Sequence, residues 1–74
     1  MRKQVGYRDK MGDEQFYFLE FNEETSRFYL VTEYISRTGG ERTLRRLLED
    51  SVGDRGHSSA VSYIRDNLFS ENHS

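Results

Sequence analysis

Residues 15–35 constrain the fold of this 74-residue chain more than any other stretch, because they hold most of its aromatic side chains. Two runs dense in strand-forming Phe, Tyr, Leu, Val, Thr and Ile flank the polar residues 22–26. Asn22 suits a turn and Ser26 suits a left-handed conformation, so the segment predicts an antiparallel β-hairpin with a four- or five-residue loop. Seven of the ten Phe and Tyr residues lie in it: Phe16, Tyr17, Phe18, Phe21, Phe28, Tyr29 and Tyr34.

Pairing Phe21 with Phe28 divides this hairpin into two faces, because side chains alternate along each strand. One face is uncharged and is the predicted core: Tyr17, Leu19, Phe21, Phe28, Leu30, Thr32 and Tyr34. The second is apolar but interrupted by two carboxylates: Phe16, Phe18, Glu20, Tyr29, Val31, Glu33 and Ile35. A slip of one residue in the register would exchange the two roles on one strand.

A further strand is predicted before the hairpin. Residues 3–9 alternate with the period of a half-buried strand, with Val5 and Tyr7 on the same side. Gly6 and the flanking basic residues are typical of an edge strand. A turn at Gly12 and Asp13 predicts that residues 1–10 fold back antiparallel on the hairpin.

Two helices are predicted after it. Thr38 and Glu41 have the spacing of a capping box, and Gly53, Asp54 and Gly56 would end the helix. Its apolar face would consist of Leu44, Leu47, Leu48 and Val52. The second helix would be capped by His57, Ser58 or Ser59 and run to Phe69, with the stripe Ala60, Val61, Ile64 and Leu68.

The sequence therefore predicts one small α+β domain over residues 1–70, with residues 71–74 as a frayed tail. Its fold would be a three-stranded antiparallel β-meander followed by two short α-helices packed on one face. The chain has no cysteine, which removes disulfides and thiolate metal sites. It has no apolar run of about 20 residues and no signal-peptide pattern, so we expect no membrane association and a cytoplasmic location.

Catalytic and metal-binding patterns are weak. Residues 54–59, DRGHSS, contain residue types used in nucleophilic catalysis, but turn and helix-cap roles explain them more simply. His57 and His73 are the only histidines, and no carboxylate spacing matches a calcium loop. We expect no enzymatic activity, no cofactor, no metal and no small-molecule substrate.

The functional hypothesis follows from the number of sheet faces that the two predicted helices can cover. Two short helices cover one face of a sheet, which would leave the second hairpin face as an exposed apolar patch of a kind that soluble monomers rarely tolerate. We therefore predict a protein-binding module, a compact regulator or inhibitor, that uses this face as a homodimer or on a different protein. Glu20 and Glu33 would pair with an arginine across the interface or lie at its rim. Alternatively, the first strand and the termini curl over this face, or one helix crosses to each side.

Charge alternates along the chain in four blocks. Residues 1–12, 13–36, 37–48 and 49–74 sum to +3, −5, +3 and −3, for a net charge of −2. The third block holds an arginine cluster at the predicted helix start, a candidate anion or nucleic-acid contact: Arg37, Arg42, Arg45 and Arg46.

Nucleic-acid binding by this cluster with Arg2, Lys3 and Arg8 is the alternative function. A solvated helix face explains the cluster more simply, because its arginines would pair with acids three and four residues away: Glu41, Glu49 and Asp50. The aromatic hairpin is also a poor platform for stacking bases, since it lies in the most negative block.

Overall fold

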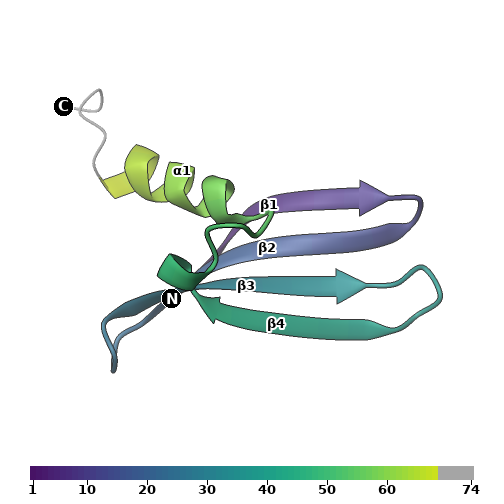
Figure 1. The fold of residues 1–74 in the computed structure, drawn as a ribbon, viewed down its shortest axis with the longest axis horizontal. Helices are drawn as coiled ribbons and strands as arrows, with labels where there is room; N and C mark the ends of the chain where they lie inside the picture. Colours follow the sequence, from purple (N-terminus) through teal and green to yellow (C-terminus); the bar gives the residue numbers. More distant parts are fainter. Residues whose placement is uncertain (69–74) are drawn as a thin grey trace.

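The computed structural model describes residues 1–68 and contains a four-stranded antiparallel sheet with one α-helix (Figure 1). The strands β1 (Arg2–Lys10), β2 (Asp13–Asn22), β3 (Arg27–Ile35) and β4 (Glu41–Leu47) are neighbours in chain order, so the sheet is a meander. The 3₁₀-helix η1 (Leu48–Asp50) and the helix α1 (His57–Leu68) follow. The predicted α+β class and meander are confirmed, whereas the predicted three strands and two helices are wrong in detail.

The central hairpin has the predicted register. Phe21 pairs with Phe28, and their ring centroids are 5.0 Å apart. In the connecting loop, the Asn22 side-chain oxygen accepts the backbone N–H of Glu24 at 2.9 Å, and Ser26 has a φ of 56°. The loop chemistry and the division of the hairpin into two faces are therefore confirmed.

The strand β1 lies at an edge of the sheet, as predicted, but its turn is one residue earlier than expected. Met11 and Gly12 have φ values of 55° and 93°, so these two residues form the turn and Asp13 already belongs to β2. Two consecutive positive φ values are typical of the tight hairpin turns that match the twist of a sheet.

A register shift between Gln4 and Gly6 changes which side chains of β1 share a face. Val5 packs against the core, while Tyr7 pairs with Phe16 on the opposite side of the sheet. The expectation that Val5 and Tyr7 share one side is wrong, because a bulge interrupts the alternation of side chains.

The chain after the hairpin is a strand and not a helix. Gly39 has a φ of 101°, and the backbone N–H of Ser36 donates to the Gly40 carbonyl at 2.7 Å, which reverses the chain. Residues 41–47 then pair with β3 over seven positions. The capping box at Thr38 and Glu41 is therefore wrong. The leucines at helical spacing favour a helix locally. The hydrogen bonds between residues 41–47 and β3 favour a strand instead, because they pair an edge of β3 that would otherwise be open.

The core lies between the sheet and α1 and contains the predicted hairpin face. Its buried apolar side chains, apart from Val31 on the other side of the sheet, are Tyr17, Leu19, Leu30 and Ala60. Five partly buried side chains pack around them: Val5, Phe28, Leu48, Tyr63 and Ile64. Val61 is 42% exposed, so its predicted place in the apolar stripe is wrong. The predictions on the Leu68 side chain, Phe69 and the 71–74 tail lie outside the described residues.

Residues 51–56 were predicted to end a helix and instead form a loop held against the sheet. The Ser51 side chain is fully buried, and its hydroxyl donates to the Leu48 carbonyl at 2.8 Å. Gly56 lies directly on Tyr17, where an added Cβ would come within 2.7 Å of the ring. The helix α1 contacts β1 and β2 and leaves the half of the sheet nearest the β1–β2 and β3–β4 turns uncovered (Figure 1). No helix within residues 1–68 has the length and apolar character needed to cross a membrane.

Candidate functional site

The side of the sheet turned away from α1, here called the back face, brings all seven predicted interface residues together. They alternate along β2 and β3 in one register: Phe16, Phe18, Glu20, Tyr29, Val31, Glu33 and Ile35. Both η1 and α1 pack on the opposite side, the front face, which contains the core. In the described part of the chain, the back face is therefore covered by no other element.

Two arginines from the edge strands lie across aromatic rings of the back face. The Cζ atom of Arg2 is 4.2 Å from the ring centroid of Phe18, and that of Arg45 is 3.7 Å from the ring centroid of Tyr29. A guanidinium over an aromatic face is attracted by the ring and shields it from water. Val31, between these two pairs, is only 3% exposed. The arginine stems thus act as a second layer over the sheet.

Each of these arginines also pairs with a glutamate of the same face. Arg2 Nη2 is 2.6 Å from Glu33 Oε2, and Arg45 Nε is 2.8 Å from Glu20 Oε1. The hydrogen bond to Glu20 is the main cause that raises the pKa of Arg45. The two glutamates therefore have arginine partners within their own chain.

Tyr7 extends the back face onto β1, a position that sequence reasoning missed because of the bulge. Its ring centroid lies 5.0 Å from that of Phe16. Its hydroxyl donates to Glu14 Oε2 at 2.7 Å, and this bond to a carboxylate raises the pKa of Tyr7 to about 12. Tyr7 therefore stays protonated, and so able to donate, further into the alkaline range than an ordinary tyrosine.

The predicted arginine cluster is not one site. Because residues 41–47 form a strand, Arg45 lies on the back face while Arg42 and Arg46 lie on the front face. Arg46 Nε is 3.7 Å from Asp54 Oδ2. The Arg37 guanidinium donates to the Met11 carbonyl at 3.3 Å, in the turn region. The predicted pairing of these arginines with Glu41, Glu49 and Asp50 side chains is not found among residues 1–68.

The uncovered half of the front face contains a row of polar side chains that crosses all four strands. The register aligns them in the order Arg8, Gln15, Tyr34 and Arg42. The Arg42 Cζ atom is 4.6 Å from the Tyr34 ring centroid, and the Tyr17 hydroxyl donates to Gln15 Oε1 at 2.6 Å. Alternation of side chains along residues 41–47 would predict this row, but the alternation is not used when the same residues are interpreted as a helix.

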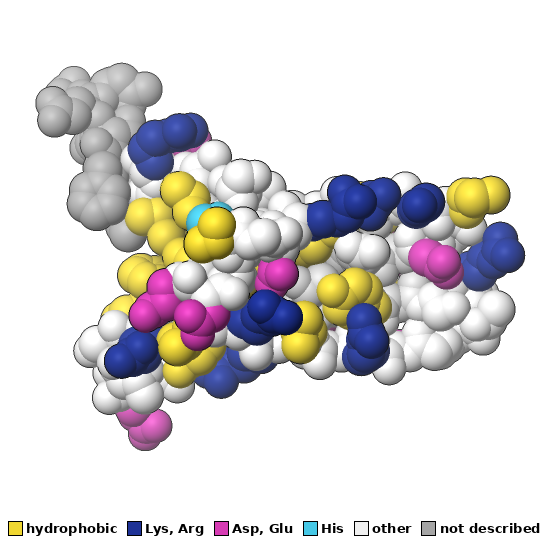
Figure 2. All heavy atoms as spheres, in the orientation of Figure 1, with side chains coloured by type: hydrophobic (Ala, Val, Ile, Leu, Met, Phe, Trp, Pro, Cys, Tyr) yellow, Lys and Arg dark blue, Asp and Glu magenta, His cyan; other side chains and the backbone are white. Residues whose placement is uncertain are grey.

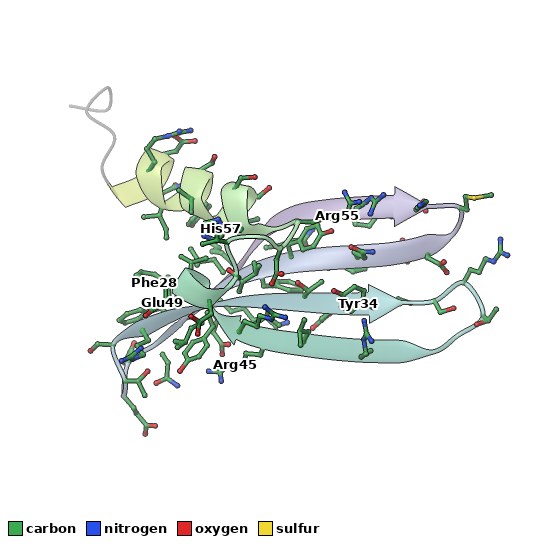
Figure 3. All side chains as sticks on the ribbon, in the orientation of Figure 1. Phe28, Tyr34, Arg45, Glu49, Arg55 and His57 are labelled. Carbon is green, nitrogen blue, oxygen red and sulfur yellow. The ribbon has the colours of Figure 1, made fainter. Side chains whose placement is uncertain are left out.

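Arg55 reaches the same half from the loop before α1 (Figure 3). With Tyr17, Tyr34 and Asp54 it borders a hollow of about 280 Å³ between the loop and the sheet. Burial is the main cause that raises the pKa of Tyr17, and the nearby charges of Arg8 and Arg55 partly oppose it. Both cations therefore lie close to the Tyr17 phenol. No pattern in the sequence indicates that Arg55 lies near the sheet, because only the fold of the loop brings it there.

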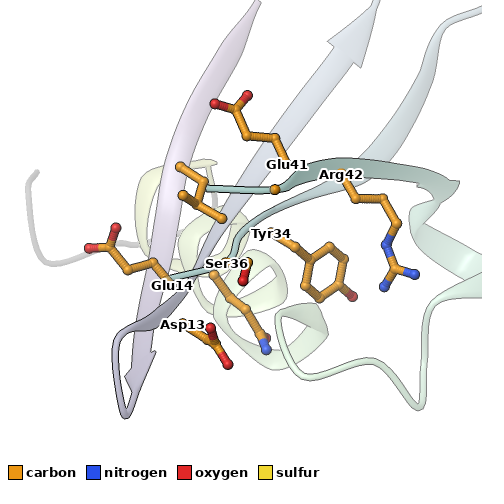
Figure 4. A pocket seen from close by; sticks show the side chains of 9 residues that line it. Asp13, Glu14, Tyr34, Ser36, Glu41 and Arg42 are labelled. Atoms are coloured by element: carbon orange, nitrogen blue, oxygen red, sulfur yellow. The ribbon is translucent and has the colours of Figure 1, made fainter. Parts of the chain in front are cut away.

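A second hollow, of about 390 Å³, lies at the end of the sheet beside Tyr34 and Arg42 (Figure 4). Asp13, Glu14 and Glu41 border it, but the Asp13 carboxylate accepts the Arg37 backbone N–H at 2.9 Å. Over residues 1–68, no group of three His, Asp or Glu side chains is placed to hold a metal ion.

The DRGHSS segment serves as the start of α1. The Gly56 carbonyl accepts the backbone N–H of Ala60 at 3.0 Å, so Gly56 and not His57, Ser58 or Ser59 occupies the N-cap position. His57 is half-buried beside Phe28 and Leu48. No hydrogen bond joins its imidazole to a serine in the part of the chain that is described.

No protein-family model, curated protein sequence or solved structure matches this chain. Function is therefore inferred from the two faces of the sheet alone.

Proposed function

We propose that the protein is a small non-enzymatic protein-binding module whose back face docks a second copy of the same chain. The observation that carries this proposal is the aromatic middle of that face, which no other element within residues 1–68 covers. A two-fold symmetric dimer uses the same patch on both subunits, so such a patch must offer each group its own partner.

The charges of the back face lie toward opposite ends of the strands. Asp9, Glu14 and Glu41 belong to one cross-strand row with Ile35, at the end near the β1–β2 turn. Arg2 lies in the row of Glu20, six residues further along β2 and so about 20 Å away. A two-fold axis running across the strands, between two facing sheets, would place each strand over its own copy, so that Asp9 of one copy would lie over Arg2 of the other. Glu14 would then face Glu20.

The middle of the back face has the composition of an interface core. Aromatic residues and arginine are enriched where protein partners bury surface, and they dominate binding energy there. The same axis would place Phe18 of one copy against Phe16 of the other. Arg2 and Arg45 are already held in place by rings and glutamates, so less side-chain entropy would be lost on docking.

The size of the face limits the strength of this association. Four strands spaced by about 4.8 Å and seven residues rising by about 3.3 Å each give roughly 450 Å² per copy. Twice this area, about 900 Å², is well below the roughly 1,200 Å² at the lower end of standard interfaces. We therefore expect a weak, concentration-dependent dimer.

Sedimentation velocity from about 1 μM to about 1 mM protein tests the proposal. The native chain should double its mass within this range, and Phe18→Ser and Asp9→Arg should shift the transition at least about tenfold upward. Val61→Ser on the outer side of α1 and Glu23→Arg in the β2–β3 loop are the matched controls, and both positions are exposed.

Far-UV circular dichroism of each variant verifies folding. A native chain that stays monomeric over the whole range would rule out the dimer, and loss of structure in Phe18→Ser would assign that side chain to the core. If the chain stays monomeric and binds a different protein through the back face, that protein and not a second copy is the partner.

A further inference from the structure

The uncovered half of the front face has an unbalanced positive charge. Its strands and the adjoining loop carry four basic residues, Arg8, Lys10, Arg42 and Arg55, against two acids, Asp13 and Asp54. The net charge of this half is therefore +2, although the whole chain carries −2. Basic side chains gather along this half of the molecule, beyond α1 (Figure 2).

These four cations have no counter-ion of their own within residues 1–68. No carboxylate there lies in salt-bridge distance of Arg8, Lys10, Arg42 or Arg55, and Asp54 pairs with Arg46. Arg8 and Arg55 are close enough to Tyr17 to affect its pKa, and Arg42 lies over the Tyr34 ring. Like charges on one half of a face repel one another, and a bound anion relieves that repulsion.

The loop that carries Arg55 is built to stay in place. Gly56 lies against Tyr17 with no room for a side chain, and the neighbouring Ser51 hydroxyl is tied to the Leu48 carbonyl. A cation on an anchored loop loses less conformational entropy on binding than one on a free loop.

The extent of the row favours an extended anion over a single phosphate. Arg8 and Arg42 stand on the two edge strands, three strand spacings or about 14 Å apart. Between them lie the Tyr34 ring and the Gln15 amide, whose carbonyl oxygen is held by the Tyr17 hydroxyl. An aromatic ring between separated cations is the arrangement that binds single-stranded nucleic acid, in which bases stack on the ring and phosphates meet the cations.

We propose that the uncovered half of the front face binds single-stranded nucleic acid. Arg8, Arg42 and Arg55 contact successive phosphates, and a base stacks on Tyr34 from the side of the hollow beneath the loop, which Arg42 does not line. A duplex is disfavoured because its bases are stacked on one another and are not free to reach a ring on a flat sheet. The site lies opposite the back face, so it is independent of the proposed dimer.

Fluorescence anisotropy with a labelled oligothymidine or oligouridine of about 12 nucleotides tests this proposal. Neutralising three phosphates gives a slope of about −2 for log affinity against log salt, so affinity should fall about 100-fold between about 20 and about 200 mM salt. Arg42→Gln should reduce that fall to about 20-fold, because one phosphate contact is lost. Binding of either oligomer supports the proposal.

Tyr34→Leu should act differently from the arginine variant. It should weaken binding by at least about fivefold at both salt concentrations and leave the salt slope unchanged, because stacking is not electrostatic. Arg27→Gln is the matched control for charge, since Arg27 is an exposed arginine at the start of β3, away from the hollow. Phe18→Ser should bind as the native chain does.

Three results would overturn the proposal. The first is no binding at about 20 mM salt, where electrostatic binding is strongest. The second is an equal loss in Arg27→Gln and Arg42→Gln, which would indicate non-specific attraction. The third is equal binding of a duplex, or displacement of the oligomer by a few mM inorganic phosphate, which would indicate a different ligand.

Discussion

The two faces of the sheet use the same kinds of residue in different ways. On the back face, Arg2 and Arg45 each lie over a ring and also pair with a glutamate. On the front face, Arg42 lies over the Tyr34 ring but has no glutamate partner within residues 1–68. An arginine with a counter-ion in its own fold stabilises the sheet, whereas one without it is available to a ligand.

The difference extends to the net charge of each face. The back face carries three basic residues, Arg2, Arg27 and Arg45, against five acids, Asp9, Glu14, Glu20, Glu33 and Glu41, a net charge of −2. The uncovered front half carries +2. Blocks of charge along the chain conceal this separation, because neighbouring residues in a strand point to opposite faces. The negative block of the hairpin thus places its carboxylates mainly away from Tyr34.

The largest expected effect concerns the buried side chains on the two faces of the sheet, one under α1 and one under the arginines. Leu19→Ala removes a fully buried side chain under α1 and should lower the free energy of unfolding by about 3–5 kcal/mol. Val31→Ala, under the arginines, should cost about 2 kcal/mol. Chemical denaturation measures both values. A neutral Val31→Ala would contradict the view that Arg2 and Arg45 bury the centre of the back face.

The loop that carries Arg55 offers the next test. Gly56→Ala should cost about 1–3 kcal/mol, because its Cβ would lie 2.7 Å from a Tyr17 ring carbon. Gly53→Ala in the same loop is the matched control, since no atom lies within 4 Å of the added Cβ, and it should change stability by less than about 0.5 kcal/mol. Equal thermal midpoints for the two variants would show that the loop does not rest on Tyr17.

Two arginines of β4 compare the faces directly. Arg45→Met loses an ion pair and a stacked guanidinium and should lower the free energy of unfolding, and added salt should reduce this loss. Arg42→Met should change stability by less than about 0.5 kcal/mol, because it loses only a stacking contact. Urea denaturation at low and high salt separates them, and a reversed order would remove the contrast between the faces.

The smallest effect concerns the Tyr7 phenol at high pH. Its pKa is raised from 10.0 to about 12 in the folded chain, so the stabilisation is complete below about pH 10 and is lost as pH rises toward 12. The phenolate absorbance of the native chain should show a step near pH 12 from Tyr7, and Tyr17, whose pKa is raised by burial, should also titrate late. Tyr7→Phe should remove that step, and its persistence in the variant would assign it to another tyrosine.

Most of the hairpin could be predicted from the sequence, and so could the seven residues of the back face. The turn-forming loop at Asn22 and Ser26 and the alternation on either side are local signals, and the pairing of Phe21 with Phe28 follows from them. The arginine cluster could not be located in the same way, because its division between the faces depends on whether residues 41–47 form a helix or a strand.

The sequence by itself determined the β-hairpin, its register and the split between a core face and a second apolar face, because these depend on neighbours within about 20 residues. Only the tertiary structure decided that residues 41–47 extend the sheet. Leu44, Leu47 and Leu48 suit a helix locally, but pairing with the open edge of β3 stabilises a strand. It also decided the bulge at Val5 and the placement of Arg55 over the sheet. Both depend on contacts with Tyr17 or its neighbours that no local pattern encodes.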